Sequence, residues 1–184
     1  MSNGSRYVVL CEDLQSSVFI SRALKQLGVK QHQIRIEPLP SSTEGGAGEQ
    51  YVRKHTPAQV KAHRSLQARV RTALIIHIDA DPANSVQDRR QQLDAALKEQ
   101  GQSPVTASER IARLVPKRNI ETWIHFYLDG PPVDEAQAYA KYTGNERACA
   151  PAAESFAQDA AGNVQPPQAP GSLLLGLDEF RRVL

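Results

Sequence analysis

The chain has 184 residues, of which 40% are hydrophobic and 23% charged, and its formal net charge is +2. This composition is typical of a soluble globular domain and excludes a uniformly basic nucleic-acid-coating protein. No apolar run approaches the roughly 20 residues that a membrane-spanning helix needs, so we expect no membrane partner. Only two cysteines are present and the N-terminus lacks the apolar stretch of a signal peptide, which together predict a cytoplasmic protein.

Hydrophobic periodicity predicts strands and helices in alternation along the first 128 residues. Continuous apolar runs are typical of strands buried on both faces, and apolar residues at intervals of three and four are typical of helices. Thr56 as N-cap and Pro57 at the first helical position predict a helix start. The expected strands are 7–11, 34–38, 73–78 and 110–115. The expected helices are 18–27, 56–70, 86–100 and a fourth that is capped by Asn119 or Thr122 and continues to Leu128.

This order of elements predicts an α/β fold, with a mainly parallel central sheet and helices on both faces. The alternation of charged and apolar residues over 110–115 predicts a strand with one exposed face. Residues 143–170 are rich in Ala, Pro, Gly and Gln and predict an irregular excursion, followed by a final helix. We therefore expect one α/β domain over 1–142, with an irregular extension and a C-terminal helix over 143–184 packed on it.

Basic residues gather in the middle of the chain. No acidic residue occurs from Gln50 to Ile78. A basic segment beside an acidic metal site would suit a phosphate-rich substrate, but a solvated helix face that lacks acids is an equally good interpretation. The residues that we assign to nucleic-acid binding are Arg53, Lys54, Lys61, Arg64 and, further along the chain, Arg118.

Acidic residues follow the two most apolar predicted strands. Glu12 comes after the first strand, and Asp79 and Asp81 come after the strand over 73–78. Sites in parallel α/β sheets form at the carboxyl ends of the strands, so these side chains would meet if their strands are neighbours. Clustered carboxylates repel one another and usually need a cation, and their hard oxygens favour Mg²⁺ or Mn²⁺. Asp79 and Asp81 are expected to point the same way along an extended segment.

These elements resemble the Toprim domain, in which an apolar strand ends in Glu and a later apolar strand ends in Asp-x-Asp, here Asp79-Ala80-Asp81. The segment 115–123, Val-Pro-Lys-Arg-Asn-Ile-Glu-Thr-Trp, resembles a segment of the small Toprim-like and OLD-type proteins. The resemblance covers residues 7–128. Toprim sequences commonly have Gly after the Glu, whereas Asp13 stands here and adds a candidate ligand.

The resemblance implies a metal-dependent nuclease or a related phosphotransfer enzyme that acts on DNA or RNA. It implies Glu12, Asp79 and Asp81 as ligands of Mg²⁺ or Mn²⁺, with Glu12 also a candidate general base. Proteins of this kind are often encoded beside an ATPase and linked to defence against phage and plasmids. A separately encoded ATPase is therefore an expected partner, and a homodimer is left open.

The segment around residue 120 supplies the other catalytic residues that the resemblance implies. Lys117 or Arg118 would neutralise the phosphate in the transition state, and Glu121 would bind a second metal or hold that basic residue. The same residues also fit an exposed basic pair before a helix, with Glu121 favoured by the helix dipole. His77 is expected to be a buried, hydrogen-bonded histidine and not a ligand.

Two non-enzymatic interpretations stay beside the nuclease. One is a non-catalytic Toprim-like scaffold that works only with a partner ATPase. The other is a receiver-like regulatory domain with a phospho-accepting Asp at a strand end, in which Lys117 would stand for the lysine that such domains have after a later strand. Asp79 and Asp81 could also do no more than cap the helix that follows them.

Overall fold

Four parallel strands form one sheet in the order β2–β1–β3–β4 in the computed structural model, which describes residues 5–40 and 48–184. Val9 lies between Ile36 and Ile75, so the first strand is central and has a parallel neighbour on each side. The strands are β1 (Arg6–Leu10), β2 (Ile34–Ile36), β3 (Thr72–His77) and β4 (Ile111–Leu114).

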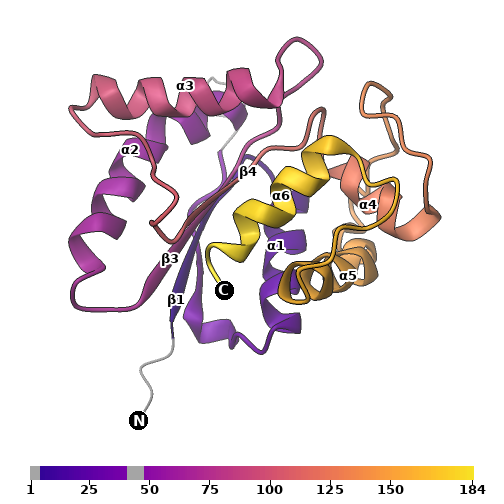
Figure 1. The fold of residues 1–184 in the computed structure, drawn as a ribbon, viewed down its shortest axis with the longest axis horizontal. Coiled ribbons are helices and arrows are strands. Elements are labelled where there is room, and N and C mark those ends of the chain that lie inside the picture. The colour runs from indigo at the N-terminus through magenta and orange to yellow at the C-terminus, as the bar shows by residue number, and fades with distance from the viewer. Residues whose placement is uncertain (1–4, 41–47) are drawn as a thin grey trace.

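Helices cover both faces of this sheet, as Figure 1 shows: α2 and α3 lie on one face, and α1, α4, α5 and α6 lie on the other. The predicted α/β class with a parallel, doubly covered sheet is confirmed. Within the described part of the chain, no helix has both the length and the apolar character to cross a membrane. The helices are α1 (Leu14–Gln26), α2 (Gly48–Leu66), α3 (Val86–Glu99), α4 (Ile120–Asp129), α5 (Ala150–Ala161) and α6 (Gly171–Arg181), with 3-10 turns at Gln31–Gln33 and Glu146–Cys149.

Each face of the sheet carries its own hydrophobic core because successive strand residues point to opposite faces. Leu74 and Ile76 of β3 pack in the core beneath α2 and α3. Ile75 belongs to the other core, which is larger and contains the fully buried aromatic rings of Trp123 and Phe156, 5.7 Å apart. The α5 and α6 helices contribute to this second core, so the C-terminal part of the chain packs on the same sheet.

The predicted start of α2 at Thr56 is wrong, because the helix already includes Gly48 and continues through Pro57. A proline inside a helix removes one backbone hydrogen bond and costs about 3 kcal/mol. Val52 and Val60, on either side of the proline, are both fully buried, and the Thr56 hydroxyl donates to the Val52 carbonyl oxygen at 2.8 Å. Burial of one apolar face along the whole helix therefore outweighs the local signal for a helix start. The predicted loop before it lies partly over residues 41–47, outside the described residues.

The predicted exposed face of the fourth strand is also wrong, because all four residues of β4 are buried. The α6 helix covers this edge of the sheet. Its Glu179 accepts a hydrogen bond from the Arg113 backbone N–H at 2.8 Å, and the Arg113 guanidinium pairs with Asp94 at 3.0 Å. The charged side chain of Arg113, on which the prediction of an exposed face was based, is thus ion-paired and covered by a helix from the C-terminal end of the chain.

Residues 143–170 are not the irregular excursion that their composition predicts, since they contain α5. The helix buries Phe156 together with four alanines on the face that packs against α1, α4 and α6. Alanine has the highest intrinsic helix propensity, and its small side chain lets a helix approach its neighbours closely. The buried alanines are Ala152, Ala153, Ala157 and Ala160.

Candidate metal centre

Glu12 and Asp79 lie side by side at the carboxyl edge of the sheet because their strands are neighbours. Leu10 of β1 pairs with Ile76 of β3, so the chain leaves both strands at the same level. The Asp79 backbone N–H donates to Glu12 Oε1 at 3.2 Å. Asp79 is 7% exposed, and this carboxylate therefore stands almost without water. The two acids that the sequence placed after these strands do meet.

His77 completes a group of three side chains that could hold a metal ion. One ligand atom from each of Glu12, His77 and Asp79 lies within 4.8 Å of the others, and His77 Nε2 is 3.6 Å from Asp79 Oδ1. His77 and Asp79 share one face because they are two residues apart on an extended chain. The expected burial of His77 is confirmed, but its expected hydrogen bond is wrong: within the described residues, neither ring nitrogen has a hydrogen-bond partner.

Burial and mutual repulsion make the charged form of this group unfavourable without a cation. Burial raises the pKa of Glu12 to about 7, and the nearby charge of Asp13 acts in the same direction. Burial also raises the pKa of Asp79 well above its usual range, and the charge of Glu12 adds to this effect. Burial lowers the pKa of His77 to about 4, so the imidazole is neutral at pH 7 and offers a lone pair.

These three residues fit a divalent cation. Buried polar atoms normally have a partner, yet Asp79 Oδ1 and both ring nitrogens of His77 have none among the described residues. A bound cation would satisfy Asp79 Oδ1 and one ring nitrogen of His77, and it would favour the ionised form of both carboxyls. Two carboxylates and one imidazole form a mixed oxygen and nitrogen set, which suits Mn²⁺ and other transition metals better than a set of oxygens alone would.

Asp81 is turned away from this group. Its φ of 61° ends the extended segment, and its carboxylate pairs with Arg89 Nη2 at 3.0 Å. The prediction that Asp79 and Asp81 point the same way is therefore wrong, since the chain turns into the left-handed region between the two side chains. As a metal ligand Asp81 stays a prediction, and in this structure its side chain is half exposed.

Hydrogen bonds of Arg89 connect the segment after β3 to α2 and α3. It is 2% exposed, and its Nε donates to the Asp79 carbonyl oxygen at 3.0 Å. Its other N–H groups reach Glu49 of α2 as well as Gln92 of α3. Sequence reasoning did not single out this residue, because its role depends on how α3 docks on the sheet.

A glycine lies against Glu12, although it does not follow Glu12 in the sequence. A side chain at Gly48 would place its Cβ 2.8 Å from Glu12 Cβ and 2.9 Å from the Glu12 carbonyl oxygen. Real Cβ atoms do not approach so closely. Gly48 therefore lets the first turn of α2 sit on Glu12, and it gives the close backbone approach that glycine allows.

Two more acids border the metal centre. Asp13 caps α1 by accepting a hydrogen bond from the Ser16 N–H at 2.8 Å, and Glu121 is 3% exposed in the first turn of α4. Both raise the pKa of Asp79 through their charge, so both lie near it. Burial raises the pKa of Glu121 itself. The predicted place of Glu121 in the first helical turn is confirmed, and its catalytic role stays a prediction.

The predicted basic pair after β4 makes contacts with backbone carbonyls. Lys117 Nζ donates to the Asn84 carbonyl oxygen at 2.7 Å, and Arg118 Nη1 donates to the Ala136 carbonyl oxygen at 3.0 Å. Both residues hold loops at the rim of the sheet. That Lys117 or Arg118 contacts the phosphate of a substrate stays a prediction. Such a contact would require these hydrogen bonds to break.

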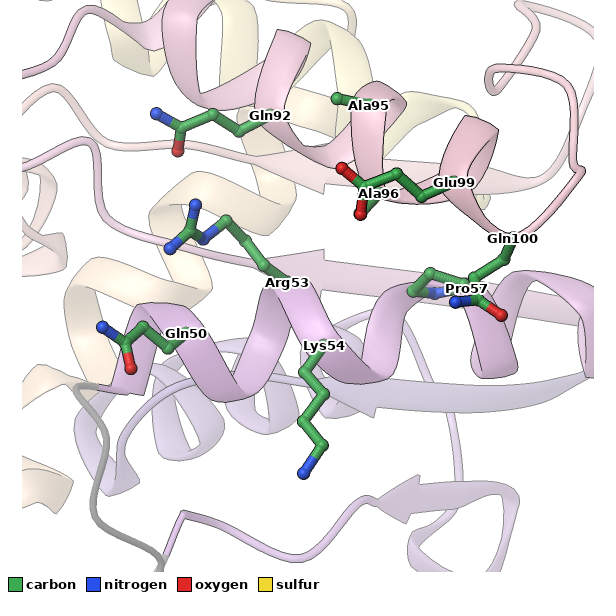
Figure 2. Close-up of a pocket in the computed structure, with 9 residues that line it drawn as sticks. All are labelled: Gln50, Arg53, Lys54, Pro57, Gln92, Ala95, Ala96, Glu99 and Gln100. Atoms are coloured by element: carbon green, nitrogen blue, oxygen red, sulfur yellow. The ribbon is translucent and has the colours of Figure 1, made fainter.

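The basic residues of α2 have different surroundings. Arg53 and Lys54 line a cleft of about 400 Å³ between α2 and α3, where Arg53 points toward α3 and Lys54 points away from it (Figure 2). Lys61 is exposed. Arg64 is engaged within the protein, since it pairs with Glu109 at 2.6 Å and donates to two backbone carbonyl oxygens.

Comparison with protein-family models, curated proteins and solved structures finds no match for this chain.

Proposed function

We propose that this protein hydrolyses phosphoester bonds of nucleic acid with a divalent cation held by Glu12, His77 and Asp79. The observation that carries the proposal is the group itself: one buried and one partly buried carboxyl, both with raised pKa values, beside a neutral histidine at the carboxyl ends of adjacent parallel strands. Such perturbed groups cluster at functional sites. The Toprim resemblance of the surrounding sequence selects phosphoester chemistry among the reactions that a metal can assist.

The proposed reaction is an attack of water on phosphorus. A divalent cation supplies Lewis acidity, which lowers the pKa of bound water and offsets the charge of the phosphate. The new bond joins the water oxygen to phosphorus, the P–O bond to the leaving group breaks, and the proton of the water passes to a nearby carboxylate. Glu12 and Asp79 are proposed as ligands, and Glu12 or Glu121 as the proton acceptor. Asp79 is then proposed to fix the position of the cation, because its carboxylate is buried and lies beside both Glu12 and His77.

A nucleic-acid substrate is supported by the free basic residues on α2. Lys61 is exposed, and Lys54 points into solvent from the rim of the cleft in Figure 2. Arg53 shares the Glu49 carboxylate with Arg89, so one carboxylate faces two guanidinium groups. Phosphate contacts of this kind provide affinity without sequence preference.

A second candidate function is a non-catalytic module that acts with a partner ATPase. The bonds of Lys117 and Arg118 to carbonyl oxygens favour it, because neither cation is directed at the carboxylates. A receiver-like version would accept a phosphoryl group on Asp79. Incubation with a small phosphodonor, followed by intact-mass measurement, would reveal a covalent adduct in that case, and a metal-dependent hydrolase would show none.

The test of the main proposal is a calorimetric titration with MnCl₂ and MgCl₂. The wild type is expected to bind Mn²⁺, and Asp79→Asn is expected to lose that binding. Asp178→Asn is the matched control, because Asp178 is an exposed acid on α6. The same proteins are then assayed with Mn²⁺ on labelled single-stranded and double-stranded DNA and RNA. Cleavage that persists unchanged in Asp79→Asn would show that the activity does not use this site.

A further inference from the structure

A pocket of about 170 Å³ opens beside the metal centre, and we propose that it receives the phosphate group of the substrate, with Lys141 as the cation that contacts it. The inference rests on the proposed function and adds a binding subsite and a contact residue to it. The pocket lies between the start of α1, the first turn of α4 and the segment 141–146. Its volume exceeds the roughly 30 Å³ share of one liquid water several times, so it has room for a phosphate group.

The pocket adjoins the metal centre through Asp13. Asp13 lines the pocket together with Glu121, and it directly follows the candidate ligand Glu12 in the chain. A group in the pocket therefore lies close to the Glu12 side of the metal centre. The larger cleft between α2 and α3 in Figure 2 is lined by neither Asp13 nor Glu121.

Lys141 is the cation that this pocket offers. Its ammonium lowers the pKa of Glu121 by its charge, so it lies near that carboxyl. Within the described residues, no hydrogen bond or ion pair engages the Lys141 side chain. Two other cations at this end of the sheet are already engaged: Lys117 donates to a carbonyl oxygen, and Arg89 donates to five acceptors within the protein. Lys141 can turn to a ligand without breaking a bond.

Charge on the pocket wall makes this a subsite that works only with a cation bound. Asp13, Glu121 and Glu146 line the pocket beside a single lysine, so a free phosphate would meet more negative than positive charge. A divalent ion held by Glu12 and Asp79 would give a phosphate oxygen a cation to bind directly, and Lys141 would then contact the other side of the phosphate. Tyr142 and Thr143 also line the pocket, and their hydroxyl groups are donors that phosphate oxygens can accept from. Phosphate binding is therefore expected to require metal.

The experiment is a calorimetric titration of thymidine 5′-monophosphate into protein saturated with Mn²⁺. This probe carries a phosphate but no phosphodiester bond that could be cleaved during the measurement. Lys141→Met is expected to weaken binding about tenfold, the effect of losing one charge-assisted hydrogen bond at a partly exposed site. Lys141→Arg keeps the charge and should bind within about threefold of wild type. Lys25→Met, at an exposed lysine in the last turn of α1, is the matched control and should bind as wild type does.

Separate readouts distinguish this inference from the proposed function. Equal nucleotide affinity in wild type and Lys141→Met would overturn the subsite, as would binding that is just as strong without Mn²⁺. No nucleotide binding by a wild type that binds Mn²⁺ would also overturn it, while the metal centre stands. If Asp79→Asn abolishes nucleic-acid cleavage and Lys141→Met leaves it unchanged, the proposed nuclease function is supported and the role of Lys141 is rejected. Unchanged Mn²⁺ affinity and melting temperature in Lys141→Met would show that its effect is not a loss of fold.

Discussion

Two buried polar clusters lie back to back at the end of β3, and they differ in how completely their atoms are paired. In the arginine cluster, Arg89 places all five of its guanidinium N–H groups on acceptors, among them the backbone carbonyls of Asp79 and Ala80. In the metal centre, Asp79 Oδ1 and both nitrogens of His77 have no partner within the described residues. The complete cluster therefore holds the loop, and the incomplete one has the character of a binding site.

The largest expected effect comes from breaking the complete cluster. Arg89→Met would leave Glu49 and Asp81 without their buried partner, and it would free two backbone carbonyls. We expect a loss of about 3–5 kcal/mol in the free energy of unfolding, measured by urea denaturation. Lys98→Met, at an exposed lysine in the last turn of the same helix, is the control for general loss of helix stability. A loss below about 1 kcal/mol would mean that the cluster is not a structural tie.

The opposite result is expected in the incomplete cluster. Asp79→Asn removes a carboxyl that burial disfavours, so the metal-free variant should be at least as stable as wild type at pH 8. The same variant should bind Mn²⁺ more than about 100-fold more weakly, since even residues that only support a metal ligand change affinity 10–100-fold. Calorimetry with Mn²⁺ and urea denaturation without it measure the two effects separately. A large loss of stability without metal would instead give Asp79 a structural role.

Gly48 connects the two clusters, because its helix carries Glu49 into the arginine cluster while Gly48 itself touches Glu12. In Gly48→Ala the new methyl group would lie 2.8 Å from Glu12 Cβ, so either Glu12 or the start of α2 must move. We expect Mn²⁺ affinity to fall about tenfold. Overpacking of this kind costs about 1–3 kcal/mol in stability. Unchanged Mn²⁺ affinity would show that Glu12 does not bind the ion.

The pH dependence of stability tests the raised pKa of Glu12, and the raised pKa of Asp79 acts in the same direction. Its pKa rises from the ordinary 4.5 to about 7 on folding, so between these values the folded protein holds a proton that the unfolded chain has released. This term lowers the stability of the metal-free protein as pH rises from about 4.5 to about 7, and it is constant above that range. His77 acts in the other direction between about 4 and 6.5, because there only the unfolded chain protonates it.

A comparison with Glu12→Gln removes the histidine contribution, which both proteins share. The stability difference between Glu12→Gln and wild type should grow in favour of the variant as pH rises from 5 to 7.5. Urea denaturation at several pH values, with a chelator present, gives this difference directly. A difference that does not change with pH would contradict the raised pKa.

The smallest expected effects concern two arginines of α2, both of which the sequence analysis assigned to nucleic-acid binding. Arg64→Ala breaks a partly exposed pair with Glu109 and should lower stability by about 1 kcal/mol without changing nucleic-acid affinity. Arg53→Ala should weaken binding of a labelled oligonucleotide a few-fold and reduce the slope of log affinity against log salt by about 1, as loss of one phosphate contact does. Equal oligonucleotide affinity in the two variants would show that the nucleic acid does not contact the α2–α3 cleft.

Periodicity predicted the order of strands and helices because the local patterns were strong there. Gly28 and Gly101, with φ of 83° and 68°, end α1 and α3 where the sequence predicts, since glycine accepts these angles at little cost. Asn119 likewise begins α4. Where a local signal competed with burial, burial decided, as at Thr56 in α2.

The sequence by itself determined the parallel α/β class and the presence of Glu12 and Asp79 at strand ends, because strand period and strand order follow from residues close together in the chain. Tertiary structure alone decided which polar atoms are paired. The turn of Asp81 toward Arg89, the contact of Gly48 with Glu12 and the close packing of Gly176 on the Trp123 ring all join segments far apart in the sequence. Such contacts depend on how whole helices dock, and a pattern of neighbouring residues carries no record of that docking.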